Sequence, residues 1–380
     1  MIRISFVGDI MCEEQQLLMN KTDYGFDFSD VFKNIKPVFL ESDFVVGNLE
    51  TPLAGEDLKY TNHKWSFNSP IEFGKAVKNA GFDLVSTANN HSLDRGIEGL
   101  NQTIKNLDHI NLNHIGTYLS EKEKEKDKNY IKDINNIKIA FISYTYGTNA
   151  SFNKVYLNKN EKHAINLFKR QERIVLRRQI VKRIILKIES YIYNGFTLNS
   201  KLRKLKNKIR LAKKEADLVF VLMHSGGQYN LKPDNWTVKL MDFLLKSHVD
   251  GVIGCHPHVV QKIAIHANSQ IGAFSLGNFC SYPGSDSCKM NQSEYSIILH
   301  TYINDKTKKI EKVTFQIAKS IVESDGKAII YLLFDLINNE KDEIIKKGLI
   351  EDNLLIVNRF LNQKKEKAEL ESEYLIANFI

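Results

Sequence analysis

Short apolar runs alternate with polar, helix-like segments along most of the chain. Five of these runs have the length of a strand, and they begin near Ile4, Phe44, Leu84, Leu218 and Val252. Runs of roughly four to eight apolar residues between polar segments are typical of buried strands. Residues 73–80 and 94–107 have helical spacing instead, and Gly81 follows the first as a stop signal. This alternation predicts an α/β fold.

Each of the five runs is followed closely by side chains that can bind a metal. These are Asp9, Asn48, Glu50, Asn89, Asn90, His91, Asp94, His224, His256 and His258. Ligands of open α/β sheets bind at the carboxyl ends of the strands, so we expect these side chains to converge. Mixed oxygen and nitrogen donors favour Mn, Fe, Zn or Mg over metals that prefer thiolates.

The run GCHPHVVQ at 254–261 places His256 and His258 on either side of Pro257. If this segment is extended, the spacing puts both imidazoles on one side. Proline fixes its own φ, so the turn is stiff. Two surface histidines in a loop are the alternative, but the other four segments favour a metal site.

Six ordered motifs over residues 1–285 resemble the CapA family of capsule and poly-γ-glutamate biosynthesis proteins. The motifs are GDIM, NLE, ANNHSLDRG, HSGGQY, GCHPHVVQ and SLGNF. That family has the fold of the calcineurin-like metallophosphoesterases. The resemblance therefore implies a four-layer α/β/β/α sandwich, with one or two divalent ions at the strand ends.

The resemblance also implies a role for each residue of the motifs. The implied metal ligands are Asp9, Glu50, Asn90, His224, His256 and His258. His91 is implied as the catalytic acid or stabilising group, and Asp94 as the residue that orients it. The residues expected to support the site or the substrate are Asn48, Asn89, Tyr229 and Asn278.

Two positions depart from the expected pattern. Met11 stands where the phosphoesterase fold has a histidine, and a thioether is a poor ligand for a hard dication. Gln228 stands where CapA proteins usually carry a glutamate, which removes one negative charge. The number of ions, one or two, therefore stays open.

We expect one large domain over residues 1–320, with a basic helical insertion at 150–215. From Ala328 the spacing becomes helical to about Ala377, which predicts a helical C-terminal extension over 321–380. Met1 leads directly into a strand-like run, and no apolar run reaches the ~18 residues of a membrane span. The four cysteines have no disulfide spacing, so we expect a cytoplasmic protein.

The basic charge is concentrated in residues 168–215. This segment has 16 Lys and Arg against three acidic residues, a net charge of +13, whereas the whole chain carries +8 and the remainder −5. Apolar residues at helical spacing predict an amphipathic helix over 168–193: Ile174, Val181, Ile184, Ile185, Ile188 and Ile192. Asn194-Gly195 ends it, and Ser200 is a candidate cap for a second helix to about Lys214.

Three interpretations of this basic segment stay open. It forms a hairpin packed on the domain, it contacts an anionic membrane surface or polymer, or it docks a biosynthetic ligase partner. Nucleic acid is disfavoured because no recognisable module accompanies the charge.

The favoured function is a metal-dependent hydrolase or transferase of the metallophosphoesterase superfamily, in capsule or poly-γ-glutamate biosynthesis. Its substrate, a small molecule or a polymer, would react at a phosphoester or acyl/amide bond. The alternatives are an amide-forming or amide-cleaving enzyme of a small-molecule pathway, and a non-catalytic assembly factor of a ligase complex.

Overall fold

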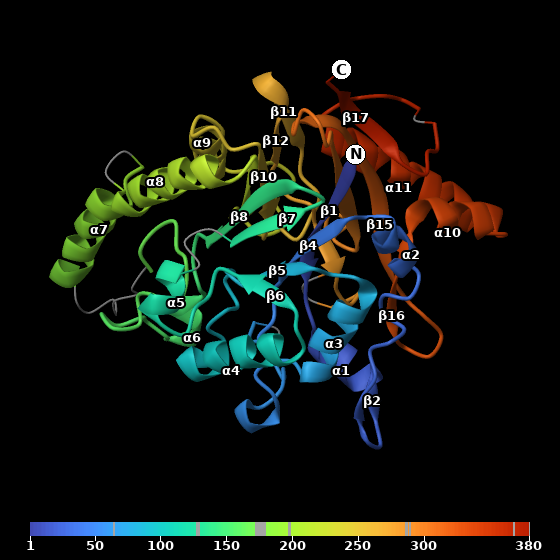
Figure 1. The fold of residues 1–380 in the computed structure, drawn as a ribbon. Helices are drawn as coiled ribbons and strands as arrows, with labels where there is room; N and C mark the ends of the chain where they lie inside the picture. Colours follow the sequence, from blue (N-terminus) through green and yellow to red (C-terminus); the bar gives the residue numbers. More distant parts are fainter. Residues whose placement is uncertain are drawn as a thin grey trace.

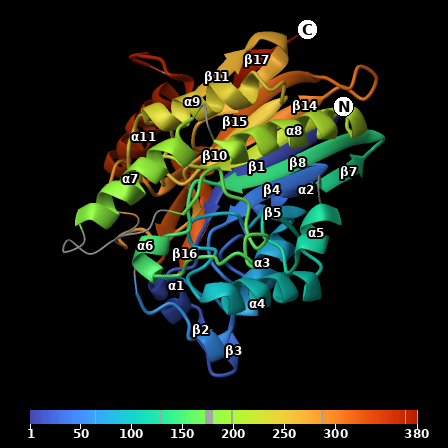
Figure 2. The ribbon, with the colours of Figure 1, turned by 90° about the vertical axis from the view of Figure 1, so that its left-hand side faces the viewer.

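Two β-sheets pack face to face, with helices on their outer faces (Figures 1 and 2). The computed structural model describes residues 1–380 except 64, 127–129, 172–179, 197–198, 286–287, 289, 368 and 380. No helix within the described residues is both long enough and apolar enough to span a membrane.

The first sheet has nine strands within the described part of the chain, in the order β16-β15-β14-β1-β4-β5-β6, with β13 beside β1 and β17 beside β15. Their bounds are β1 (Ile2–Ile10), β4 (Phe44–Leu49), β5 (Leu84–Ser86), β6 (Asn113–Ile115), β13 (Asn278–Cys280), β14 (Tyr295–Ile303), β15 (Ile310–Val322), β16 (Ala328–Leu332) and β17 (Tyr374–Asn378). Strands β1, β4, β5 and β6 are parallel neighbours, so their carboxyl ends meet at one edge.

The second sheet has six strands among the described residues, in the order β11-β12-β10-β9-β8-β7. Their bounds are β7 (Tyr130–Ile134), β8 (Ile137–Thr145), β9 (Leu218–His224), β10 (Gly251–Cys255), β11 (Ile263–His266) and β12 (Gln270–Ala273). Strands β8, β9, β10 and β12 run parallel. A separate short hairpin joins β2 (Lys21–Thr22) and β3 (Gly25–Phe26).

Helices lie on the outer faces of both sheets, but the last two helices contribute buried residues to the core between the sheets. Their bounds are α1 (Glu14–Met19), α2 (Lys36–Leu40), α3 (Ile71–Ala80), α4 (Gly96–His109), α5 (Glu121–Lys126), α6 (Ala150–Asn153), α7 (Ile180–Asn194), α8 (Ser200–Glu215), α9 (Asn235–Leu245), α10 (Leu333–Asn339) and α11 (Glu343–Leu361). Buried residues of α1 to α3 pack on the first sheet, and those of α8 and α9 pack on the second. The predicted four-layer α/β/β/α sandwich is confirmed. Helix α3 stops at Gly81 (φ 112°), as its sequence predicts.

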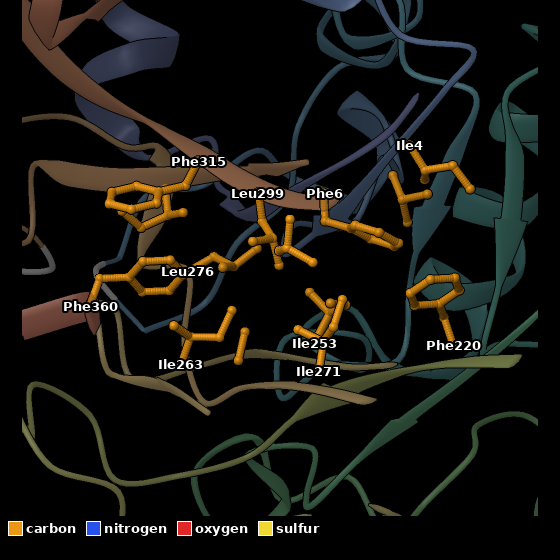
Figure 3. Packing of buried hydrophobic residues seen from close by; sticks show 14 of the residues in the cluster. Ile4, Phe6, Phe220, Ile253, Ile263, Ile271, Leu276, Leu299, Phe315 and Phe360 are labelled. Atoms are coloured by element: carbon orange, nitrogen blue, oxygen red, sulfur yellow. The ribbon is translucent and has the colours of Figure 1, made fainter. Parts of the chain in front are cut away.

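The main core lies between the two sheets. Figure 3 shows Phe6 and Leu299 of the first sheet facing Ile253 and Ile271 of the second. The rings of Phe6 and Phe220 are 5.0 Å apart, a contact that adds about 0.5–1.5 kcal/mol to simple burial. This close packing holds the strand ends of both sheets in fixed relative positions.

The prediction of a helical extension over 321–380 is wrong at both ends of that segment. Residues 328–332 form β16 and residues 374–378 form β17, both paired with β15. The run AIIYL is rich in β-branched and aromatic residues, and β15 offers it an unpaired edge. Helix α11 places Phe360 against Phe315 in the main core, with 4.9 Å between the rings. The domain limits stay a prediction, although β15 runs across residue 320.

The basic insertion contains two helices that differ in burial. Helix α8 buries Leu202, Leu205, Ile209 and Ala212 against the second sheet. Its N-cap is Asn199 and not Ser200, because the Asn199 side chain accepts hydrogen bonds from two backbone N–H groups. Helix α7 covers Ile180–Asn194 of the described residues, and residues 172–179 of the predicted 168–193 helix lie outside them. At residues 168–171 the prediction is wrong, because they are not helical.

Candidate metal centre

Six side chains predicted as metal ligands meet where the carboxyl ends of strands from both sheets lie close together. They come from β1, β9 and the segments that follow β4, β5 and β10, and they are Asp9, Glu50, Asn90, His224, His256 and His258. All six are at most 2% exposed. Burying ionisable groups costs free energy unless each finds a partner, so the partners decide what the site can do.

Asp9 is held by hydrogen bonds from neighbouring strands. Its Oδ1 accepts from Asn48 Nδ2 at 2.7 Å, and its Oδ2 accepts from the backbone N–H of His256 at 3.0 Å. The same Oδ2 lies 3.5 Å from His258 Nδ1. Asn48 therefore supports the site, as expected, by orienting a ligand.

Glu50 has a different environment. Within the described residues, neither of its carboxylate oxygens accepts a hydrogen bond. Its Oε1 lies 3.4 Å from His224 Nε2 and 3.9 Å from His258 Nε2. A buried carboxylate without a donor is costly, and a divalent cation is one partner that removes the cost.

Glu50 is shared by two sets of ligand atoms. One set joins Glu50, His224 and His256, the other joins Asp9, Glu50 and His258, and the atoms of each set lie within 4.8 Å of one another. Among the described residues, His256 Nδ1 also has no hydrogen-bond partner. These buried groups fit a divalent ion, and Glu50 lies where it can serve two.

The electrostatics of the centre suit a cation. Burial, together with the nearby Glu50, raises the pKa of Asp9 to about 7, and burial raises the pKa of Glu50 to about 7. Burial lowers the pKa of His224 and of His258 to about 4, and that of His256 well below its usual value. The imidazoles are therefore neutral at pH 7, the form that binds metals.

The closing histidines reach the site through a turn. Strand β10 ends at Cys255, and His256 (φ 101°) and His258 (φ 59°) both lie in the left-handed region. The expectation of an extended segment is thus wrong, although both side chains still reach the centre. Such backbone costs roughly 1–3 kcal/mol per residue and persists where its surroundings enforce it. Here the bond from His256 N–H to Asp9 is one such restraint.

The ligand candidate Asn90 and two predicted supporting residues, Asn278 and Tyr229, contact the imidazoles. Asn90 Oδ1 is 2.6 Å from His224 Nε2, and Asn278 Oδ1 is 2.9 Å from His258 Nδ1. The ring of Tyr229 lies 5.8 Å from that of His258. Contacts of this kind fix the orientation of an imidazole before it binds an ion.

Asn89 holds the segment that carries His91. Its side-chain N–H donates to the carbonyl of Leu49 at 2.7 Å, and its Oδ1 accepts from the His91 backbone N–H at 3.1 Å. Asn89 therefore ties the loop after β5 to the end of β4.

His91 and Asp94 form the predicted pair. His91 Nδ1 is 2.6 Å from Asp94 Oδ2, and His91 Nε2 is 4.0 Å from Glu50 Oε1. Burial lowers the pKa of His91, but Asp94, with Glu50 and Asp9, outweighs it and raises that pKa above its usual value. His91 thus differs from the three other imidazoles of the centre, because the protonated form is favoured.

The structure adds residues that the sequence did not indicate. Phe67 stacks on His91 with 4.3 Å between the rings, and Asn153 donates to Asp94 Oδ1 at 2.7 Å. Phe67 lies in a loop and Asn153 ends the four-residue helix α6, and neither position has a readable sequence pattern. Tyr146, whose ring is 4.7 Å from that of His256, directly follows β8, so the strand-end rule applied to that run would have found it.

Sequence comparisons agree with this geometry. A family model described as "Bacterial capsule synthesis protein PGA_cap" matches residues 3–283. The chain is 29% identical over 282 residues to "Capsule biosynthesis protein CapA" of Bacillus anthracis, covering 73% of this chain and 59% of that one. It is 26% identical over 276 residues to "PGA biosynthesis protein CapA" of Bacillus subtilis (strain 168), covering 72% of this chain and 62% of that one.

The match spans about three fifths of the length of these two relatives. A crystal structure of a protein from Thermus thermophilus matches 82% of this chain and 97% of its own, with 8% identity and a TM-score of 0.34. Nothing about the site follows from a likeness of that size.

Proposed function

Because residues 3–283 match its model, the chain belongs to the family of bacterial capsule synthesis protein PGA_cap, and we propose that it is a metal-dependent enzyme. The proposed role is in capsule or γ-glutamyl polymer biosynthesis, at a phosphoester or an acyl/amide bond. The names of the two CapA relatives support the pathway. The support for catalysis comes from the site itself.

The observation that carries the proposal is the environment of Glu50. This carboxylate is fully buried, and no hydrogen-bond donor satisfies its oxygens among the described residues. The neutral imidazoles of His224, His256 and His258 lie close to it, and His91 Nε2 is 4.0 Å away, beyond hydrogen-bond distance. A carboxylate with a purely structural role is normally paired with N–H groups or a cationic side chain. Glu50 fits a ligand whose partner is a metal ion.

The proposed ligands are the six residues of the centre, with Glu50 common to both sets. Their mixed nitrogen and oxygen atoms suit Mn, Fe, Zn or Mg. When bound, such an ion polarises a substrate oxygen and lowers the pKa of its water toward ~7. The number of ions, one or two, is part of what must be measured.

His91 is proposed to hold the proton that the reaction uses. Asp94 fixes Nδ1, so Nε2 is the atom that faces Glu50 and the centre. A proton on Nε2 can be given to a leaving group, or can stabilise negative charge that develops there. Asp94 is itself held by the Phe67 backbone N–H at 2.7 Å and by Asn153 at 2.7 Å.

Elemental analysis of protein purified without chelators tests this proposal. We expect bound metal in the wild-type protein and very little in Glu50→Gln and in His256→Ala. His114→Ala is the matched control, because its imidazole contacts Asp108 and lies outside the centre. Wild-type protein that holds no metal even after dialysis against Mn, Fe, Zn or Mg would overturn the proposal.

A panel of phosphoesters and γ-glutamyl amides then separates the reactions. Turnover of amides alone identifies the alternative of an amide-forming or amide-cleaving enzyme. A second candidate, a non-catalytic assembly factor, is favoured by the exposed faces of α7 and α8. If the chain is an assembly factor, Glu50→Gln should leave capsule or polymer formation in the cell intact.

We also propose a cytoplasmic location. Cys12, Cys255, Cys280 and Cys288 are all unpaired and buried, and burial raises the pKa of each thiol. Unpaired thiols are usual in reducing compartments. Cell fractionation tests this, and recovery of the chain outside the cytoplasm and its membrane would contradict it.

A further inference from the structure

Helix α7 exposes the apolar stripe that its sequence encodes. The side chains of Val181, Ile184, Ile185, Ile188 and Ile192 are between 46% and 71% exposed. At about 100° per residue, these five positions fall within an arc of roughly 100° on one side of the helix. Leu186, on the opposite side, is less exposed. Figures 1 and 2 both show α7 at the periphery of the molecule, beyond the two sheets.

Leaving such a stripe in water is costly. Burial of an isoleucine side chain stabilises a folded chain, and α7 forgoes this gain at several positions. The adjoining helix α8 obtains this gain by packing its own stripe on the second sheet. Contiguous exposed aliphatic side chains on one helix face usually mark a contact surface.

Exposed cations lie on both helices of the basic segment. Lys182 and Lys187 are exposed on α7. Helix α8 exposes five more: Arg203, Lys204, Lys206, Arg210 and Lys214. Burial, and then the cations Lys124, Arg170, Lys204 and Lys162, lowers the pKa of Lys201 to about 8, which shows how closely the positive charges gather. An anionic partner relieves this repulsion.

We propose that α7 binds the surface of an anionic lipid bilayer. The aliphatic stripe enters the boundary between headgroups and acyl chains, and the cations of α7 and α8 face the lipid phosphates. Tyr191, 82% exposed at the margin of the stripe, suits the headgroup level, where tyrosine is enriched. The contact is peripheral and does not depend on the metal centre.

Other occupants of this surface explain only part of it. A soluble polyanion neutralises the cations but leaves the isoleucines in water. A second copy of the chain covers the isoleucines but brings together two segments that each carry +13. A bilayer with anionic headgroups satisfies the apolar and the charged side chains together.

Sedimentation of the full chain with vesicles tests the proposal. We expect binding to phosphatidylcholine vesicles that contain about 30 mol% phosphatidylglycerol at low salt, and weaker binding in about 0.5 M salt because exposed charges are screened. The double variant Ile184→Ser/Ile188→Ser should partition at least about tenfold more weakly, because each lost CH₂ contributes about 0.8 kcal/mol when buried. The reversal Lys182→Glu/Lys187→Glu should also bind more weakly.

The pair Ile344→Ser/Ile345→Ser is the matched control, since these isoleucines are exposed on α11, outside the basic segment. It should bind vesicles like the wild type. Unchanged circular dichroism and metal content in all variants show that the fold and the centre are intact.

Four results would overturn the proposal. The first is no binding to anionic vesicles at low salt, and the second is equal binding to neutral vesicles. The third is vesicle binding that Ile184→Ser/Ile188→Ser leaves unchanged, as a polyanion site predicts. The fourth is self-association without vesicles that this variant abolishes, because a second copy then covers the stripe.

Discussion

The metal centre and helix α7 each depart from the usual rule that charged side chains are exposed and apolar ones are buried. The centre buries carboxylates, with Asp9 and Glu50 at 0% exposure, whereas α7 exposes isoleucines, with Ile188 at 54%. Each arrangement costs free energy in the isolated chain, and each is relieved by a partner of matching chemistry. In the proposals made above, the partner of the centre is a compact positive charge, and the partner of α7 is an apolar phase beside negative charge.

The two regions also differ in how tightly the chain positions them. The ligands of the centre are fixed by the ends of strands from both sheets and by bonds such as that between Asn48 and Asp9. On helix α7, the residues whose burial is described are exposed or half-buried. A site for one ion needs ligand atoms in fixed positions, whereas a membrane surface tolerates small changes in the pose of a helix.

The largest effect should come from Glu50→Gln. This change removes a ligand that both sets of the centre share, so metal affinity should fall by more than about 1,000-fold, beyond the 10–100-fold typical of supporting residues. Titration calorimetry on chelator-stripped protein measures it. With EDTA present, the variant should melt no lower than the wild type, because the amide replaces a buried carboxylate without a donor. Unchanged affinity would remove Glu50 from the ligand set.

His91→Ala separates catalysis from ligation within the centre. Turnover should fall by roughly 10²–10⁴-fold, the usual contribution of a general acid or base. Metal content should stay near the wild-type value, because His91 Nδ1 is already held by Asp94. A loss of metal comparable to that of His256→Ala would reassign His91 as a ligand.

Truncating one isoleucine on each basic helix tests the contrast between buried and exposed stripes. Ile209→Ala on α8 should lower the free energy of unfolding by about 2–5 kcal/mol, because Ile209 is fully buried. Ile188→Ala on α7 should change it by less than about 0.5 kcal/mol in the absence of lipid. Urea denaturation measures both, and an equal loss in the two variants would show that α7 is packed in solution.

His300 shows what burial does to a histidine outside the centre. It is fully buried, with Nδ1 2.7 Å from Ser5 Oγ and Nε2 3.0 Å from Gln316 Oε1. Burial, and then the charge of Arg3, lowers its pKa to about 3, from a usual value of 6.5. Below pH 6.5 the unfolded chain therefore takes up a proton that the folded chain does not.

The linkage predicts that His300 costs the folded state about 2 kcal/mol of stability when pH falls from 7 to 5. The variant His300→Gln should lose less stability over the same interval. Urea denaturation at both pH values, with chelator present, measures the difference between the two proteins. Identical pH dependence would show that His300 is protonated in the folded state.

The smallest effect should come from Met11→His. Met11 lies two residues beyond Asp9 in the sequence, and the ligand set that contains Asp9 has one imidazole, His258, where the other set has His224 and His256. Another imidazole should raise the affinity for the more weakly bound ion by about tenfold. Calorimetry that shows two equally tight ions in the unaltered protein would contradict this asymmetry.

Local patterns were enough to predict most of the framework and the members of the centre. Each strand that carries a ligand was visible as an apolar run, and Asp9, Glu50, Asn90 and His224 were identified because they follow such runs. Parallel strands bring their carboxyl ends to one edge, so position along the chain already implied convergence. Phe67 and Asn153 could not be found this way, because a loop and a four-residue helix are too short or irregular to give a periodic signal.

The sequence by itself determined the local periodicities: the five strand runs that end in candidate ligands, the helix that stops at Gly81, and the amphipathic spacing of α7. Only the tertiary structure decided that Ile209 is buried while Ile188 is exposed, and that 328–332 pairs with the edge of β15. It also decided that Glu50 has no donor and that His256 and His258 reach the centre from a left-handed turn. Periodicity reflects backbone geometry within a segment, whereas burial and hydrogen bonding depend on residues far away in the chain.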